Sequence, residues 1–374
     1  MTDITVADSP LRAALGELGA AFVDVGGRAV VRHFGDTAAE YAAVREAVGV
    51  AERGDRARIR MWGKDPAKML HGMITNDLLK APEGQGVYAA MLTAKGRTLA
   101  ELRAFRREPT ELLIEIPREA LAGTVEHLRK FVPPMFARWA DASDEVGELG
   151  AYGPNAAALV ERVFGVDVAL MAEDGFREVE FGGVRVMMAG TRYVGGEPGY
   201  DLFAPSAALP ALWAALLEQG GDLGARPVGL AAIETLRIEA GRPRYGADLS
   251  EEVIPTEAFE ETGMMQRAIS FTKGCYTGQE VIVRIAHRGH VNRHLRGFLL
   301  GDGPAPAAGT PIFRADTGKE AGRLTSVAFS PMMGQGVALG FARRELEPGA
   351  EVRIGAADGP PARLVRLPFQ RVPL

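Results

Sequence analysis

Hydrophobic and polar residues in the first two thirds of the chain repeat one local pattern. A short run of apolar or alternating residues meets a glycine or proline, and a segment with helical periodicity follows. Proline is well placed at a helix start, because the N–H that it lacks would have no partner there in any case. The four units comprise residues 58–61 with 68–73, 112–116 with 119–131, 150–152 with 156–164, and 200–203 with 207–219.

Helical spacing is clearest in the second of these units. Leu121, Val125, Leu128 and Phe131 recur at intervals that place them on one side of a helix, which predicts one buried stripe. Strands that alternate with helices in this way predict antiparallel or mixed sheets with helices on one face, which is an α+β fold. A doubly wound nucleotide-binding sheet has little support, because no G-x-G-x-x-G follows a strand and no Walker loop is present.

The pattern changes after about residue 285. Short runs typical of strands are separated by glycine and proline, as at residues 301–304 and 359–361, and helical periodicity is missing. This pattern predicts a separate all-β domain at the C-terminal end, a small barrel or sandwich. Its expected strands are residues 295–300, 322–329, 337–341, 351–354 and 362–367.

Composition narrows the class of protein. A chain of 374 residues predicts two or three domains, and its net charge of −5 argues against direct nucleic-acid binding. Cys275 is the single cysteine, which rules out an internal disulfide framework and an all-cysteine metal site. The longest apolar run, residues 207–217, is shorter than the roughly 20 residues of a membrane span, and no secretory signal is visible. We therefore expect a cytoplasmic protein without a membrane partner, and a monomer.

Two segments stand out from this background. The first reads L-R-I-E-A-G-R-P-R-Y-G-A-D-L at residues 236–249, and the second reads K-G-C-Y-T-G-Q-E at residues 273–280. The second resembles the K-G-C-Y-x-G-Q-E signature of the YgfZ family of tetrahydrofolate-binding proteins of iron–sulfur cluster assembly and repair. The first resembles a block shared by their wider superfamily, which includes the aminomethyltransferase (T-protein) of the glycine cleavage system. A T-N-D at residues 75–77 and a P-F at residues 368–369 add to a resemblance that runs from about Val50 to Phe369.

The resemblance implies both a fold and a function. The implied fold is T-protein-like, with two sheet-plus-helix domains and a C-terminal β-barrel domain around a central cleft. Residues 1–50 and 145–285 would form an interleaved folate-binding domain, residues 51–144 a second, ferredoxin-like α+β domain, and residues 286–374 the barrel. The implied function is tetrahydrofolate-dependent support of iron–sulfur client or assembly proteins, with a link to tRNA modification.

Departures from the T-protein pattern favour the YgfZ family. The T-protein carries an Asp-Asp pair after a glycine turn, and one of these aspartates is its catalytic acid; here the pair is Ala100 and Glu101. The T-protein's tyrosine near the C-terminus has no counterpart in residues 370–374, and its F-I-G-[KR]-E type motif is replaced by the cysteine motif. Two alternatives remain: a folate-dependent aminomethyltransferase or demethylase, and a folate-binding scaffold without catalysis.

Folate makes chemical demands that particular residues can meet. A carboxylate accepts both N–H groups of the pterin edge, and a cation meets the glutamate tail. By the resemblance, Glu197 and Arg237 match the folate-contacting glutamate and arginine of the superfamily, and Asn76, Tyr200 and Tyr245 lie in the same folate-binding blocks. The alternatives are a surface glutamate in a glycine-rich turn, and a structural ion pair of Arg237 with Glu239 or Asp248.

Cys275 is the strongest candidate for a reactive group. A lone cysteine is usually a small buried hydrophobe. Here Gly274 precedes it, Lys273 lies two residues earlier, and Gly278 follows, and flexible backbone with a nearby cation is typical of an accessible, reactive thiol. We therefore predict catalytic roles for Cys275 and Lys273, and positive φ angles or close backbone approaches at both glycines.

Three histidines follow the cysteine motif closely. Their spacing suits metal ligands on one helical face, but the flanking apolar runs suggest strands and a turn that would scatter them, so we predict no metal site. The same window is locally basic. It would bind the anionic folate tail, an RNA or an acidic protein, or it would form a solvated rim without a partner. The histidines are His287, His290 and His294, and the arginines are Arg284, Arg288, Arg293 and Arg296.

Overall fold

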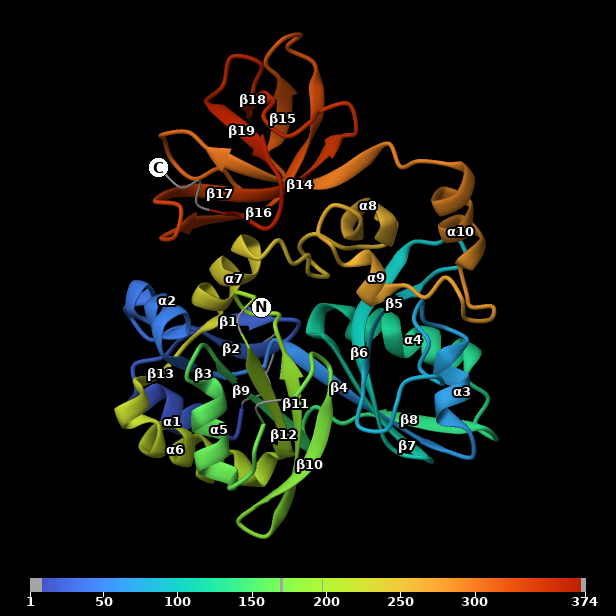
Figure 1. The fold of residues 1–374 in the computed structure, drawn as a ribbon, viewed down its shortest axis with the longest axis vertical. Coiled ribbons are helices and arrows are strands. Elements are labelled where there is room, and N and C mark those ends of the chain that lie inside the picture. Colours follow the sequence, from blue (N-terminus) through green and yellow to red (C-terminus); the bar gives the residue numbers. More distant parts are fainter. Residues whose placement is uncertain (1–8, 169–170, 197, 371–374) are drawn as a thin grey trace, which may run out of the picture. The chain divides into compact units, whose positions relative to one another are not determined.

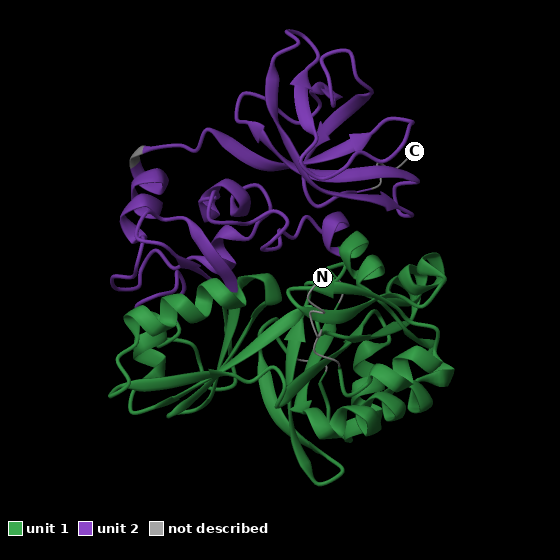
Figure 2. Cartoon of the chain, turned by 180° about the vertical axis from the view of Figure 1, so that it is seen from behind, with its two compact units in different colours: residues 1–71, 78–88, 102–236 green, residues 72–77, 89–101, 237–374 purple. Residues whose placement is uncertain are grey.

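The computed structural model describes residues 9–168, 171–196 and 198–370, and the chain divides into two units (Figure 2). The first unit comprises residues 1–71, 78–88 and 102–236, and the second comprises residues 72–77, 89–101 and 237–374. The division into three domains that the resemblance implies stays a prediction. No helix among the described residues is both long and apolar enough to cross a membrane.

A six-stranded mixed sheet forms one half of the first unit, with the order β10-β11-β12-β9-β3-β13 (Figure 1). Neighbouring strands are antiparallel except β13, which pairs with β3 in parallel. The bounds are β3 Val48–Glu52, β9 Val146–Tyr152, β10 Phe176–Phe181, β11 Val184–Thr191, β12 Gly199–Pro205 and β13 Ala225–Pro227. A separate hairpin consists of β1 (Ala21–Val25) and β2 (Arg28–His33).

Alternate residues of this sheet enter different cores, because successive side chains of a strand point to opposite faces. Val48 and Val50 of β3 pack in the main core with α1 (Arg12–Glu17), α5 (Ala156–Phe164) and α6 (Leu209–Gln219). Ala51 instead joins a smaller core with α2 (Thr37–Glu46) and α7 (Leu230–Glu239). Helices therefore cover one face fully and the second face in part. Short 3-10 turns lie at Ser206–Ala208 and Gly221–Leu223.

The structure also contains a five-stranded sheet with the order β5-β6-β7-β4-β8. Its bounds are β4 Arg56–Gly63, β5 Val87–Leu92, β6 Thr98–Glu108, β7 Glu111–Pro117 and β8 Ala137–Asp141. Within the first unit, Phe105 of β6 and Leu113 of β7 share a small core with Met187, Ala189 and Phe203 of the six-stranded sheet. The helices that accompany this sheet are α3 (Pro66–His71) and α4 (Leu121–Phe131), the latter after a 3-10 turn at Arg118–Ala120.

All four predicted strand–helix units are present, and the α+β class is confirmed. The buried stripe predicted for α4 is partly wrong. Leu128 is fully buried, but Phe131 is 47% exposed, and Thr124 takes a buried position that its polarity did not suggest. Phe131 is the last residue of α4, so no further helical turn follows to cover its ring.

The second unit contains a closed barrel with the strand order β14-β17-β16-β15-β18-β19, all pairs antiparallel. This confirms the predicted C-terminal β domain and adds one strand, β15, which the sequence analysis missed. A run of four residues beginning with proline is too short to show a strand pattern. The bounds are β14 Arg293–Leu300, β15 Pro311–Arg314, β16 Glu320–Ser330, β17 Gln335–Arg343, β18 Glu351–Ile354 and β19 Pro361–Val365.

Three short helices precede the barrel: α8 (Pro255–Phe259), α9 (Met265–Ala268) and α10 (Gln279–Arg288). The last corrects the expectation of strands around the Val-Ile-Val run. Gly278, with φ +80°, turns the chain, and residues 279–288 then form an amphipathic helix in which Ile282 is buried. β-Branched residues favour strands only weakly, so the helical placement of apolar residues decides.

Candidate functional site

The K-G-C-Y-T-G-Q-E segment forms an ordered loop that leads into α10. Cys275 is exposed, whereas Lys273 is 6% and Tyr276 is 7% exposed. The Lys273 ammonium donates hydrogen bonds to the carbonyl oxygens of Ile74 (2.7 Å) and Asn76 (2.9 Å), and lies 5.0 Å from the Tyr276 ring centre. The loop therefore presents its thiol outward and anchors itself through the lysine.

Burial changes the acid–base behaviour of this lysine. Removal from water lowers the pKa of Lys273 to about 8, and the attraction of Asp77 opposes that change. The two carbonyl contacts hold the ammonium at the T-N-D segment and at Ile74, the residue before it. The structure thus gives Lys273 an anchoring contact, and the catalytic role expected for it stays a prediction.

The T-N-D segment is itself fixed by side-chain contacts to the chain before the loop. The Thr75 hydroxyl donates to Ala268 O (2.7 Å) and the Asn76 amide to Arg267 O (2.7 Å). Backbone bonds from Ser270 N to Thr75 O and from Thr277 N to Gly72 O, both 3.0 Å, flank the lysine. The structure therefore brings Asn76, Lys273 and Cys275 into one local assembly, a neighbourhood that the two motifs did not predict.

Only one of the two motif glycines has a positive φ. Gly278 has φ +80°, and a Cβ at this position would lie 2.6 Å from Thr93 O. Gly274 is not among the residues with positive φ, and a Cβ there would meet nothing within 4 Å. The prediction of a special backbone is thus correct for Gly278 and wrong for Gly274, whose open surroundings accommodate a side chain.

The position of the missing carboxylate pair lies on β6 and is fully buried. Ala100 and Glu101 are both 0% exposed, and the Glu101 carboxylate accepts a hydrogen bond from Tyr245 N (2.8 Å). Burial raises the pKa of the Tyr245 phenol, and Glu251 and Glu101 add to this effect. Glu101 therefore fixes the backbone of the turn that bears Tyr245, a contact that sequence reasoning missed because the residues are far apart in the chain.

Arg237 forms the structural ion pair that the sequence left as an alternative. Its guanidinium lies 2.5 Å from an Asp248 oxygen and 2.7 Å from the Ser326 hydroxyl. Asp248 also accepts from Arg244 N (3.1 Å), so the pair closes the turn around Tyr245. Glu239, the other expected partner, accepts a hydrogen bond from the Ser330 hydroxyl.

The remaining predicted folate residues belong to the first unit. Tyr200, on β12, is 5% exposed, packs in the main core, and donates to Val168 O at 3.4 Å. Burial, with Glu161 adding, raises the pKa of its phenol. Glu197 lies outside the described residues. His287 and His290 are exposed, one at the end of α10 and the other beyond it, and His294 is on β14; no metal-binding cluster occurs among the described residues.

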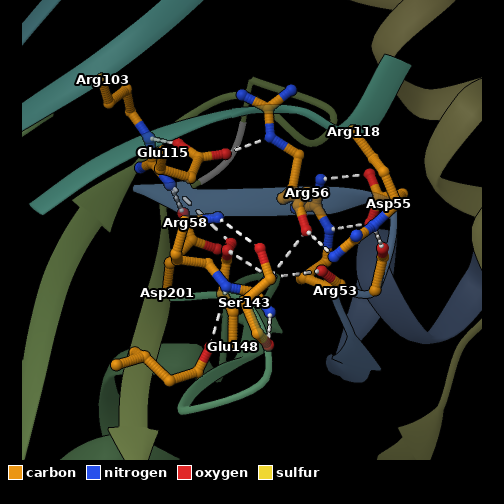
Figure 3. Close-up of polar contacts among 12 residues, drawn as sticks. Arg53, Asp55, Arg56, Arg58, Arg103, Glu115, Arg118, Ser143, Glu148 and Asp201 are labelled. Atoms are coloured by element: carbon orange, nitrogen blue, oxygen red, sulfur yellow. Dashed lines mark hydrogen bonds and ion pairs between the residues drawn. The ribbon is translucent and has the colours of Figure 1, made fainter. Parts of the chain in front are cut away.

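Sequence reasoning also missed a network of buried charges in the first unit, drawn in Figure 3. On paired strands, Glu115 of β7 lies opposite Arg103 of β6, and Arg103 bridges Glu115 and Asp201 of β12. Tyr152 donates to Asp201 (2.6 Å) and accepts from Arg53 (2.6 Å). The available signal was alternation of arginine with apolar residues in residues 56–61, which is unusual for a strand with a buried face.

The carboxyl of Glu148, which belongs to this network, accepts no hydrogen bond from the described residues. Glu148 is 1% exposed and lies 3.8 Å from Arg58 and 4.0 Å from Arg103, without a hydrogen-bond partner among the described residues. Burial raises its pKa well above the ordinary range, and the nearby Glu115 and Asp201 add to this effect. Burial therefore favours the protonated form of the Glu148 carboxyl over the ionised form.

Comparisons with known proteins agree with this architecture. A family model described as the GCVT N-terminal domain matches residues 11–273, and one described as the glycine cleavage T-protein C-terminal barrel domain matches residues 293–370. The chain is 31% identical over 367 residues to an aminomethyltransferase of Rubrobacter xylanophilus, covering 98% of this chain and 95% of that protein. It is equally similar to an aminomethyltransferase of Saccharopolyspora erythraea, at 31% over 97% of this chain and 98% of that protein.

A solved structure gives the same result for the fold. The glycine cleavage system aminomethyltransferase T from Bartonella henselae superimposes with a TM-score of 0.86 at 21% identity, covering 98% of both chains. These findings support the wider superfamily and leave the YgfZ subfamily, which the cysteine motif indicates, as a prediction. Because both family models match and the likeness spans 95% of the Rubrobacter xylanophilus relative, this chain belongs to the GCVT family, the superfamily of the glycine cleavage T-protein.

Proposed function

We propose that this protein binds a reduced folate and transfers a one-carbon unit, as a folate-dependent enzyme of the aminomethyltransferase kind. The observation that carries this proposal is the likeness to named aminomethyltransferases over 98% of this chain and 95% of the relative. A likeness of that extent includes both the N-terminal part and the barrel, so it does not come from one shared module.

The proposed folate residues differ in how well they fit a ligand. Tyr245 offers a half-buried aromatic ring on a turn that Glu101 and Asp248 hold in place, which suits a p-aminobenzoyl wall. Arg237 is occupied by Asp248 and Ser326, so we assign it the role of organising that turn rather than of meeting the glutamate tail. Glu197 remains the proposed acceptor for the pterin edge.

Calorimetric titration with tetrahydrofolate tests this proposal directly. We expect binding, with Glu197→Ala weaker by about 2–3 kcal/mol, the scale for leaving a buried polar partner unpaired. Tyr245→Phe keeps the ring and should bind nearly as well as the wild type, whereas Tyr245→Ser should bind less tightly. Absence of binding at millimolar folate would overturn the proposal.

A second candidate is the YgfZ function, support of iron–sulfur enzymes through Cys275. The observation that favours it is the lack of an available carboxylate at the position of the T-protein's catalytic acid. Ala100 has no carboxylate, and the buried Glu101 carboxylate binds a backbone N–H, while the single thiol of the chain is exposed. A misplacement of a catalytic group by about 1 Å can cost about a hundredfold in rate, so glycine-cleavage turnover would then be negligible.

Two assays distinguish the candidates. The first assay measures turnover of an aminomethylated lipoyl carrier protein through the release of ammonia or formaldehyde. Turnover supports the first candidate and contradicts the second. Loss of iron–sulfur enzyme activity in cells that carry Cys275→Ser, with folate binding unchanged, supports the second. In the second case Glu101→Gln, which preserves an oxygen acceptor for Tyr245 N, should have little effect on the cellular activity.

A further inference from the structure

The end of α4 and the connection to β8 expose large apolar side chains in the first unit. Phe131 is 47%, Met135 is 76% and Phe136 is 37% exposed. Together with Arg129, Lys130 and Arg138, all exposed, they form what we call the basic apolar surface. The elements that carry it, α4 and β8, are labelled in Figure 1.

Backbone contacts hold this surface in a defined conformation. Val132, which is 5% exposed, anchors the segment, and two prolines at residues 133–134 prevent the helix from continuing. Phe136 N and Ala137 N then donate to Pro133 O at 3.0 and 3.3 Å, and Asp65 N donates to Phe136 O at 3.0 Å. Because the turn is already ordered, a partner that binds there would not have to order it, and such preorganisation favours affinity.

The charge of this surface has one sign. Residues 127–140 contain no aspartate or glutamate, although the whole chain has a net charge of −5; exposed Glu126 and Asp141 border this stretch. Within the described part of the chain, none of the three cations forms an ion pair with a carboxylate, and Lys130 lies 5.3 Å from the Phe131 ring centre. His127 packs 4.6 Å from the same ring, and burial together with Lys130 lowers its pKa, so at neutral pH it adds neutral aromatic surface.

We propose that the basic apolar surface binds an acidic face of another protein. Phenylalanine, methionine and arginine are the residue types enriched in protein–protein interfaces. Unmatched cations call for carboxylates on the partner. An open hollow of about 580 Å³ lies along α4 and is lined by Ala122, Val125, Glu126, Arg129 and Lys130, so one carboxylate accompanies its two cations.

Other occupants fit less well. A nucleic-acid site is dominated by polar and charged groups, whereas this surface centres on three large apolar side chains. A symmetric pairing of two copies would place the same cations against one another, which is unfavourable. A bilayer with anionic lipids shares the required chemistry, and it is therefore an outcome of the test.

The test uses a fluorescent peptide of alternating glutamate and leucine as the probe, with the full-length protein at low ionic strength. We expect saturable binding that weakens with added salt, and no binding of the matched lysine–leucine peptide. Arg129→Gln with Lys130→Gln, and separately Met135→Ser, should each weaken binding roughly tenfold, the scale of a truncated hot spot. Arg343→Gln with Arg363→Gln, and Phe329→Ser, change exposed cations and an exposed large apolar side chain on the barrel and should have no effect.

Thermal unfolding of each variant shows whether its fold is intact. Three outcomes would overturn the proposal: no binding of the acidic peptide, equal loss in the barrel variants, or equal binding in the α4 variants. Tighter capture by phosphatidylserine vesicles than by the peptide, lost in the α4 variants, would replace the protein partner with a membrane. Sedimentation as a dimer that the α4 variants abolish would replace it with a second copy.

Discussion

At the scale of single residues, Lys273 is a lysine whose buried surroundings disfavour its charged form. Its ammonium is largely removed from water, and its compensation consists of two backbone carbonyls and an aromatic ring. Burial therefore lowers its pKa to about 8 from the ordinary value of 10.5. Since the folded pKa is below the unfolded one, the folded state binds fewer protons between pH 8 and 10.5, and in this window the lysine's contribution to stability rises with pH.

Lys273→Met should therefore destabilise the protein more at pH 10 than at pH 7.5. The lysine's contribution is fully present above pH 10.5 and is lost as the pH falls through 8, and the methionine has no such dependence. The difference in the free energy of unfolding between the two proteins, measured in urea at both values, checks this. Lys95→Met at an exposed position is the control for loss of a lysine. A difference that shrinks with pH would contradict the prediction.

Cys275 should react with iodoacetamide in the native protein, because its side chain is exposed. Cys275→Ser should leave the free energy of unfolding within about 0.5 kcal/mol, as is usual for surface substitutions. Mass spectrometry of the alkylated protein and urea unfolding of the variant measure the two results. A thiol that reacts only after denaturation would show a buried structural cysteine instead.

At the scale of elements, the start of α10 depends on one glycine. Gly278→Ala should destabilise the protein by about 2 kcal/mol or more, since alanine resists a left-handed backbone and its Cβ would lie 2.6 Å from Thr93 O. Gly274→Ala is the matched control in the same loop, because a Cβ there meets nothing within 4 Å. Thermal unfolding compares them, and equal transition temperatures for the two variants would show that the turn at Gly278 tolerates a side chain.

At the scale of the whole molecule, the buried charges of the first unit connect its two sheets, as Figure 3 shows. Burial raises the pKa of Glu115, but Arg103 and Arg56 outweigh it, so the pKa is lowered and the carboxylate is ionised. Glu148 lies in the same network with its pKa raised well above the ordinary range by burial. Two carboxyl groups of one network thus have pKa values shifted in opposite directions.

These two glutamates should respond differently to replacement by glutamine at neutral pH. Glu115→Gln breaks a buried ion pair and should cost about 3–5 kcal/mol of stability. Because burial favours the protonated form of Glu148, Glu148→Gln should cost less, under about 1.5 kcal/mol. Urea unfolding at pH 7 measures both. If Glu148→Gln proves as costly as Glu115→Gln, Glu148 is ionised in the folded protein.

Local pattern was sufficient for much of the fold. The strand–helix units and most barrel strands were predictable, because apolar periodicity and glycine or proline punctuation act over a few residues. The helical 279–288 segment and the exposed Phe131 were not, because each depends on what the rest of the chain packs against. Propensity is a weak guide wherever tertiary contacts compete with it.

By itself, the sequence determined the superfamily, the α+β class with its barrel, and the residues that share motifs. The tertiary structure alone decided what those residues do. It turned Lys273 toward two carbonyls, paired Arg237 with Asp248, and placed Glu101 against the backbone of Tyr245. The physical reason is that a buried polar group must find a partner, and the partners available to it come from segments far away in the chain. The local sequence pattern therefore does not predict which partner a buried polar group has.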